Sequence, residues 1–389
     1  MRLRDKTPHI GILTIMLIVT SLVSKNEVNA SNGLIGEQGP YPPPVSTPHS
    51  VTGPYKIFLP LTSSEFPTPP TDSYYMFTTN DMWGLGCNLG TATAQLPGIQ
   101  NRFVFLDFGN PNRDSNGYYG TQLFNQDLVT VNDINSSVYV FAQAFKYCLR
   151  NAGDYSSFLT IGVGTNSSGG SNLDLIATAH GSAWAQLVID INGRLAGDSI
   201  TTNAIAVGAS NMEPGFNTYA ITKKWVDGYR GKVGHFRLYN IGSADGCPLY
   251  YPPNDPYHNY YSPGACNNNW NQDQIYNVSW NGNNGDTWFI PEIYESVNEA
   301  NSQQWYRIGL YANLSLSYRM TFEGSITQSG VCQQYLDRGD TTRWNLYCSE
   351  RDNSPQEGYS ELYNWINTHD QYDRMDNGMK WSTDIREYR

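Results

Sequence analysis

The sequence predicts an α/β fold, a TIM-like (β/α) barrel, on three observations. Short apolar runs with the character of buried strands alternate along the chain with segments of helical periodicity. Strands and helices that alternate at this pitch form parallel βαβ units. Several of the apolar runs end in a carboxylate, where parallel α/β proteins place their reactive groups. Because no GxGxxG motif follows the first clear strand, a doubly wound sheet is the second choice.

The expected elements follow from apolar runs for strands and from apolar spacings of three and four for helices. Residues 270–280 fit either a short helix or a short strand, so the barrel need not have eight regular units. In chain order we expect strand 103–109, helix 135–151, strand 158–164, helix 173–195, strand 204–209, helix 218–229, strand 235–241, strand 288–294, helix 299–312 and strand 320–327.

The two ends of the chain are predicted to lie outside the barrel domain, which we place at 73–332. Residues 1–30 combine a basic start, an apolar stretch and small residues before position 31, which predicts a secretory signal peptide; an uncleaved membrane anchor is the alternative. Residues 31–72 have the Pro-, Ser- and Thr-rich composition of a linker. Residues 333–389 are polar, and we expect a C-terminal extension that covers the barrel and carries a helix at 359–368.

The net charge of the chain and its expected signal peptide limit the kinds of molecule that the protein can bind. Removal of residues 1–30 takes away four basic and two acidic side chains, so the net charge falls from −11 to −13. Such acidity argues against nucleic acid, because phosphate binding needs clustered Lys and Arg. We expect an exported protein, extracellular or on the cell surface, with no membrane span in the mature chain.

Six cysteines in an exported chain favour disulfides. Cys247 and Cys266 flank one long polar loop, and Cys332 and Cys348 flank another, which leaves Cys87 with Cys148; fifteen pairings are open to six cysteines. A metal site is the weaker interpretation, because the chain has no CxxC and no HExxH motif. We therefore expect neither a metal nor another cofactor.

Five acids stand at the ends of apolar runs: Asp107, Glu213, Asp245, Glu292 and Glu323. Cleavage of a glycosidic bond needs two carboxyl groups, one protonated and one ionised. Glu213 is the first candidate for the general acid, since it follows a Gly- and Ala-rich strand end. Its alternative role is the start of the next helix, where an acid complements the helix dipole and Pro214 suits the first turn.

Glu292 and Glu323 compete as the second catalytic carboxylate. Asp107 is a candidate for orienting the pair or binding substrate. The alternative for these three is a helix cap or a buried hydrogen-bonded acid. Asp245 lies beside Cys247, where a role in a turn is the more natural interpretation.

Polar and aromatic side chains near the strand ends are candidates for substrate binding. Asn166, Asn211 and Tyr294 would contact sugar hydroxyls, and Trp280 and Trp288 would stack on sugar rings. Trp270, also near a loop, is a further stacking candidate, whereas Trp184, Trp225, Trp305 and His180 lie in expected helices and are predicted to pack in the core.

Several segments together resemble a group of secreted bacterial glycoside-hydrolase-like (β/α)-barrel proteins. The resemblance covers about residues 100–330, implies the fold, and carries over no catalytic residue. The segments are Phe105-Leu-Asp-Phe-Gly, Ile161-Gly-Val-Gly-Thr-Asn, Gly208-Ala-Ser-Asn-Met-Glu-Pro, Trp225-Val-Asp-Gly-Tyr, Gly242-Ser-Ala-Asp-Gly-Cys-Pro and Pro291-Glu-Ile-Tyr.

The leading hypothesis is an exported carbohydrate-active hydrolase. It would cleave a glycosidic bond in a polysaccharide or cell-wall glycan by a two-carboxylate mechanism. The alternative is a non-catalytic secreted or surface protein that binds glycan or a protein partner. The Pro-rich linker and the 28 Tyr of the chain favour that alternative. Convergence of two of the acids in one cleft would favour the enzyme.

Overall fold

The computed structural model describes residues 70–166, 173–215, 217–251, 259–280, 287–295, 297–351, 353–368 and 379–389. The expected signal peptide and nearly all of the expected linker lie outside these residues.

Eight parallel strands form a barrel in which sequence order is also spatial order. Two isolated parallel bridges, Phe289 with Phe322 and Glu292 with Ile326, bring the β9 and β10 segments together, so the barrel is nearly closed. This topology confirms the predicted TIM-like barrel. The strands are β1 (Thr71–Met76), β2 (Asn101–Asp107), β6 (Phe158–Asn166), β7 (Ala204–Asn211), β8 (Leu238–Asn240), β9 (Thr287–Phe289), β10 (Gly324–Thr327) and β11 (Trp381–Tyr388).

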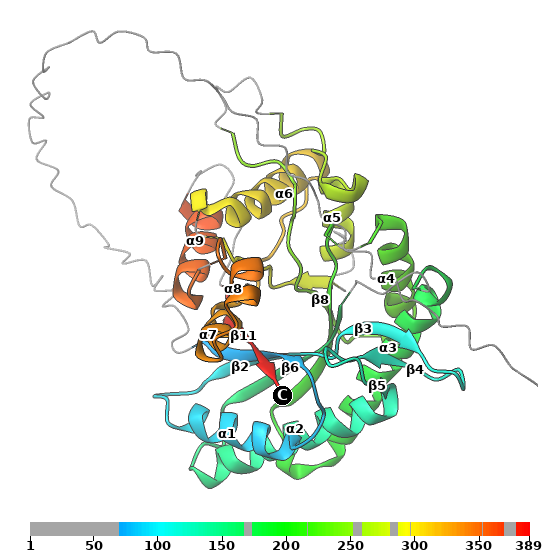
Figure 1. Cartoon of the computed structure of the whole chain (residues 1–389), viewed down its shortest axis with the longest axis vertical. Helices are drawn as coiled ribbons and strands as arrows, with labels where there is room; N and C mark the ends of the chain where they lie inside the picture. The colour runs from blue at the N-terminus through cyan, green and yellow to red at the C-terminus, as the bar shows by residue number, and fades with distance from the viewer. Residues whose placement is uncertain are drawn as a thin grey trace, which may run out of the picture. The chain divides into compact units, whose positions relative to one another are not determined.

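Helices connect successive strands and surround the barrel (Figure 1). Local sequence sets their limits, as where the Thr130 side chain and Asp133 form a capping box at the start of α2. The connecting helices are α1 (Met82–Ala94), α2 (Val131–Asn151), α3 (Leu173–Gly197), α4 (Tyr219–Val233), α5 (Gln272–Ser279), α6 (Ala300–Leu316) and α9 (Pro355–Thr368).

Two insertions interrupt the alternation of strand and helix. A small antiparallel sheet separates β2 from α2 and consists of β3 (Asn110–Arg113), β4 (Tyr119–Gln122) and β5 (Leu128–Thr130). A helical pair precedes α9 and consists of α7 (Ser329–Asp337) and α8 (Thr341–Tyr347).

The C-terminal part of the chain belongs to the barrel, which differs from the peripheral extension expected for 333–389. The helix expected at 359–368 is present within α9, and β11 pairs with β1 on one side and β10 on the other. The charged residues of β11 have tertiary partners: Thr327 Oγ1 donates to Asp384 Oδ1 at 2.9 Å, and Arg386 Nε lies 3.0 Å from Asp72 Oδ1. Its polar sequence is therefore compatible with a barrel strand.

The apolar core has two parts. One fills the barrel interior, where Phe103, Phe105 and Ile290 are fully buried. Close packing there explains Gly164, because a Cβ at this position would collide with the Phe105 ring. The other part lies between strands and helices and contains Trp184, Trp225 and Trp305, which are buried as predicted.

Three disulfides have the pairing that the sequence predicts. Cys87–Cys148 joins α1 to α2, Cys247–Cys266 closes the loop after β8, and Cys332–Cys348 joins α7 to the end of α8. A disulfide that closes a loop of about 15 residues stabilises a fold by about 3 kcal/mol, mainly by constraining the unfolded chain. Within the described ranges, no helix has the length and apolar character needed to cross a membrane.

Candidate active site

A cavity of about 640 Å³ opens at the carboxyl-terminal face of the barrel. This is the face on which TIM barrels carry their active sites. The strands and the loops that follow them contribute most of the lining residues: Tyr75, Phe77, Asn166, Asn211, Glu213, Ser243, Asp245, Glu292, Tyr294, Glu295, Gln328 and Glu387.

Glu213 lies two residues beyond β7 and is 4% exposed. The backbone N–H of Ser243 donates to its Oε2 at 2.6 Å. Gly242 leaves room for this carboxyl, because a Cβ there would lie 3.0 Å from the same oxygen. The pKa of Glu213 is raised to about 7, chiefly by burial and next by the negative charge of Asp245, against the hydrogen bonds from Ser243. Since α4 begins at Tyr219, Glu213 does not occupy a helix start.

Glu292 follows β9 and faces the same cavity, 7% exposed. Asn211 Nδ2 donates to its Oε1 at 3.1 Å. Burial holds the pKa of Glu292 well above its usual range, and the charges of Glu213 and Asp245 raise it further. Both carboxyls of the pair therefore hold a proton more tightly than a solvent-exposed glutamate does.

Asp245 also belongs to the cavity, although the sequence favoured a turn. A Cβ on Gly215 would lie 3.3 Å from both Asp245 Oδ2 and Glu213 Oε1, so these two carboxyls converge there. The adjoining Cys247–Cys266 disulfide and the hydrogen bond from Asn267 N to Asp245 O, at 3.2 Å, hold this loop. The position of Asp245 after an apolar run was the sequence signal that could have placed this acid in the site.

The structure brings Asn166, Asn211 and Tyr294 to the cavity wall, where the sequence had placed substrate contacts. Tyr75 adds an aromatic ring that no sequence pattern indicated, and it packs 4.8 Å from the ring of Phe124, in the turn between β4 and β5. Such rings offer the apolar surface on which sugars stack.

Glu323 does not join these carboxyls. It precedes β10, and its Oε2 lies 2.8 Å from Nζ of Lys380, which precedes β11. Both residues are therefore at the amino-terminal edge of the barrel, opposite the cavity. The sequence predicted a strand over residues 320–327 that would contain Glu323. The observed strand β10 begins only at Gly324, so Glu323 precedes it.

Trp280 and Trp288 also lie outside the cavity lining. The guanidinium of Arg237 is 3.5 Å from the Trp288 ring centroid, and Lys380 Nζ is 5.2 Å from it. Trp280 packs 5.8 Å from Trp288. Trp270, the third stacking candidate, is only 1% exposed. These indoles have protein partners and do not form the predicted sugar platform.

Asp107 is fully buried at the end of β2 and does not line the cavity. It accepts a hydrogen bond from Gly109 N at 2.8 Å, and burial raises its pKa to about 7. This is the buried hydrogen-bonded acid that the sequence left open as the alternative.

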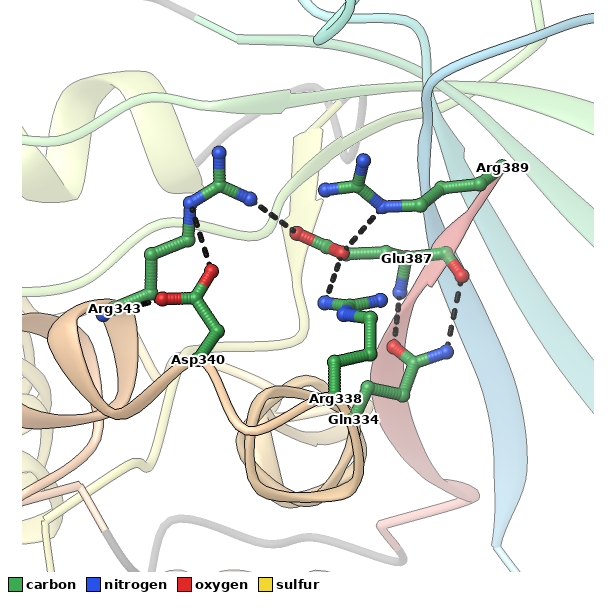
Figure 2. Close-up of polar contacts among 6 residues, drawn as sticks. All are labelled: Gln334, Arg338, Asp340, Arg343, Glu387 and Arg389. Carbon is green, nitrogen blue, oxygen red and sulfur yellow. Dashed lines mark hydrogen bonds and ion pairs between the residues drawn. The ribbon is translucent and has the colours of Figure 1, made fainter.

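A third buried acid at the cavity, Glu387, is held by arginines (Figure 2). Its Oε2 lies 2.5 Å from Arg338 Nη2 and 2.8 Å from Arg389 Nε, and its Oε1 lies 4.0 Å from Arg343 Nη1. Burial favours its neutral form, but Arg389 and Arg338 outweigh burial and lower its pKa. Glu387 therefore stays ionised and ties the helical pair α7–α8 to the barrel, which excludes it as a proton donor.

The described residues contain no group of three or more His, Cys, Asp and Glu that could hold a metal ion. His180 is buried, and Trp225 Nε1 donates to its Nδ1 at 2.9 Å while its Nε2 lies 2.8 Å from Gly120 O. Burial lowers its pKa to about 4, so it is a neutral core histidine, as the sequence predicted.

Comparisons with known proteins do not assign a family. No family model matches the chain, and no curated protein matches it in sequence. Solved structures with a distant likeness include a sugar phosphate isomerase/epimerase from Parabacteroides distasonis, at 10% identity and a TM-score of 0.36, with 82% of this chain and 88% of that one covered. Another is a glycoside hydrolase family 5 protein from Bacteroides vulgatus, at 10% identity and a TM-score of 0.32, covering 82% of this chain and 58% of that one. At these values neither likeness assigns an activity.

Proposed function

We propose that this protein is an exported hydrolase that cleaves a glycosidic bond in a polysaccharide or cell-wall glycan. The observation that carries the proposal is the pair Glu213 and Glu292. Both carboxyls are nearly buried, face one cavity at the carboxyl end of a (β/α) barrel, and have raised pKa values. A pair of acids with unequal proton affinity is what glycoside hydrolysis requires.

The proposed roles follow from the environments of the two acids. Glu292, whose pKa is raised by burial and by the charges of Glu213 and Asp245, donates its proton to the glycosidic oxygen as the bond to the anomeric carbon breaks. Glu213, hydrogen-bonded to Ser243 N, is ionised and either attacks the anomeric carbon or takes a proton from the attacking water. These roles are the reverse of the sequence expectation, in which Glu213 was the acid.

The test replaces each acid by its neutral isostere. Glu292→Gln and Glu213→Gln should each lower kcat roughly 10²–10⁴-fold on a panel of plant, algal and cell-wall glycans. Glu323→Gln, which alters a buried acid at the opposite edge of the barrel, is the matched control and should retain activity. Melting temperatures of the two active-site variants should not fall, because each substitution removes a carboxyl whose charge is disfavoured by burial.

Full activity of either active-site variant would refute the assignment. If the wild-type protein binds glycans but releases no reducing ends, the non-catalytic alternative takes its place.

A further inference from the structure

The cavity has two chemically different sides. Glu213, Asp245, Glu292 and Glu295 follow strands β7, β8 and β9. Two arginines, Arg343 on α8 and Arg351 just after it, line the part of the cavity supplied by the chain between β10 and β11. The mechanism proposed above uses the acids and gives the arginines no role.

Arg343 is held in place by its own contacts (Figure 2). Its Nε lies 3.5 Å from Asp340 Oδ2, and its Nη1 lies 4.0 Å from Glu387 Oε1. Its Nη2 has no hydrogen bond or ion pair with the described residues. The guanidinium thus lies near two carboxylates and keeps donor capacity toward the cavity.

Arg351 lines the cavity, is exposed, and forms no ion pair within the described part of the chain. Its charge nevertheless acts on Glu213, Glu292 and Glu295. Its backbone N–H donates to Cys348 O at 3.0 Å, beside the Cys332–Cys348 disulfide. The backbone from which the Arg351 side chain extends is therefore fixed. Arg351 forms no ion pair with these acids, so its guanidinium donors are available to a ligand in the cavity.

We propose that Arg343 and Arg351 bind an anionic substituent of the glycan, a carboxylate, sulfate or phosphate ester on a sugar near the scissile bond. This inference rests on the proposed function and names its substrate class. Guanidinium groups present paired N–H donors that match the oxygens of all three anions. The disulfide and the Glu387 contacts hold the segment that carries both arginines in place before the ligand arrives.

The test measures binding by calorimetry to paired glycans, each charged member beside its neutral counterpart. The pairs are galacturonic acid oligomers with galactose oligomers, sulfated with desulfated galactans, and phosphorylated with dephosphorylated cell-wall glycans. The Glu292→Gln variant prevents turnover during the measurement. We expect about tenfold tighter binding of the charged member of at least one pair, the scale of one charge-assisted contact.

Arg351→Gln should remove most of that preference, and Arg351→Lys should retain part of it. Lys224→Gln removes a positive charge from an exposed ion pair with Asp174 on the outer helices, and it should leave the preference intact. Affinity for the neutral glycans should be the same in all four proteins, which separates the proposed contact from a general loss of folding.

The outcomes separate this inference from the proposed function. Equal binding of charged and neutral members in every pair, or an Arg351→Gln variant with an unchanged preference, overturns the anionic subsite even if the wild-type protein hydrolyses glycans. A charge preference that depends on Arg351 in a wild-type protein without hydrolytic activity supports the subsite and overturns the enzyme. Binding of no member of any pair overturns the subsite.

Discussion

Asp245 carries a negative charge that acts on both Glu213 and Glu292 and raises both pKa values. Glu213 must be ionised and Glu292 protonated in the proposed mechanism. The profile of kcat/KM against pH should therefore rise through about pH 7 as Glu213 loses its proton, and fall at higher pH as Glu292 does. Because the two groups interact, the two limbs give apparent pKa values that belong to the pair and not to either residue alone.

Asp245→Asn should move both limbs of this profile to lower pH, because the neutral amide no longer opposes ionisation of the pair. The measurement is kcat/KM between pH 4 and 10 on one soluble substrate. Asp227→Asn, on the outer surface of α4 in an ion pair with Lys223, is the matched control and should leave the limbs in place. An unchanged profile in Asp245→Asn would show that Asp245 does not set these proton affinities.

At the scale of elements, β11 decides whether the barrel is closed. It pairs with the whole of β1 and the whole of β10. Deleting residues 379–389 would expose the edges of both neighbours and remove the Glu387 contacts that hold α7–α8. We expect the shortened protein to lose its cooperative thermal transition, as followed by circular dichroism.

A variant that begins at Pro60 keeps every described element and is the control for this deletion. It should unfold cooperatively. If the protein without residues 379–389 melts like the control, β11 is a peripheral addition and the barrel is stable with seven strands.

Much of the barrel was predictable because its strands are apolar runs, such as Phe103-Val-Phe-Leu in β2. β11 was not, because its stability comes from partners distant in sequence, as with Asp384 and Thr327. The site was predictable in part. Glu213 and Glu292 follow their strands, as the sequence predicts. An apolar run does not show where its strand begins, however, and β10 begins only after Glu323, so the sequence assigned this acid to the wrong end of the barrel.

For the whole molecule, the burial of neutral acids couples folding to pH. The pKa values of Asp107 and Glu213 are raised to about 7, and that of Glu292 is raised well above its usual range. In the unfolded chain these groups ionise near pH 4, so between pH 6.5 and 8 the folded state binds more protons than the unfolded state. The free energy of unfolding should therefore fall as pH rises through this window. The neutral His180 has the opposite effect only below about pH 6.5, where it becomes protonated in the unfolded chain.

Glu213→Gln removes one of these groups, so the variant should lose less stability than the wild-type protein between pH 6.5 and 8. Over this window the loss should be smaller by on the order of 1 kcal/mol, as a folded-state pKa of about 7 requires. Urea denaturation at several pH values measures it. Asp133→Gln, which alters the exposed capping box at the start of α2, is the control and should lower stability by a similar amount at each pH. If the free energy of unfolding depends on pH in the same way in Glu213→Gln and in the wild-type protein, Glu213 is already ionised in the folded protein at pH 6.5. The acid would then lack the raised proton affinity on which its pairing with Glu292 depends.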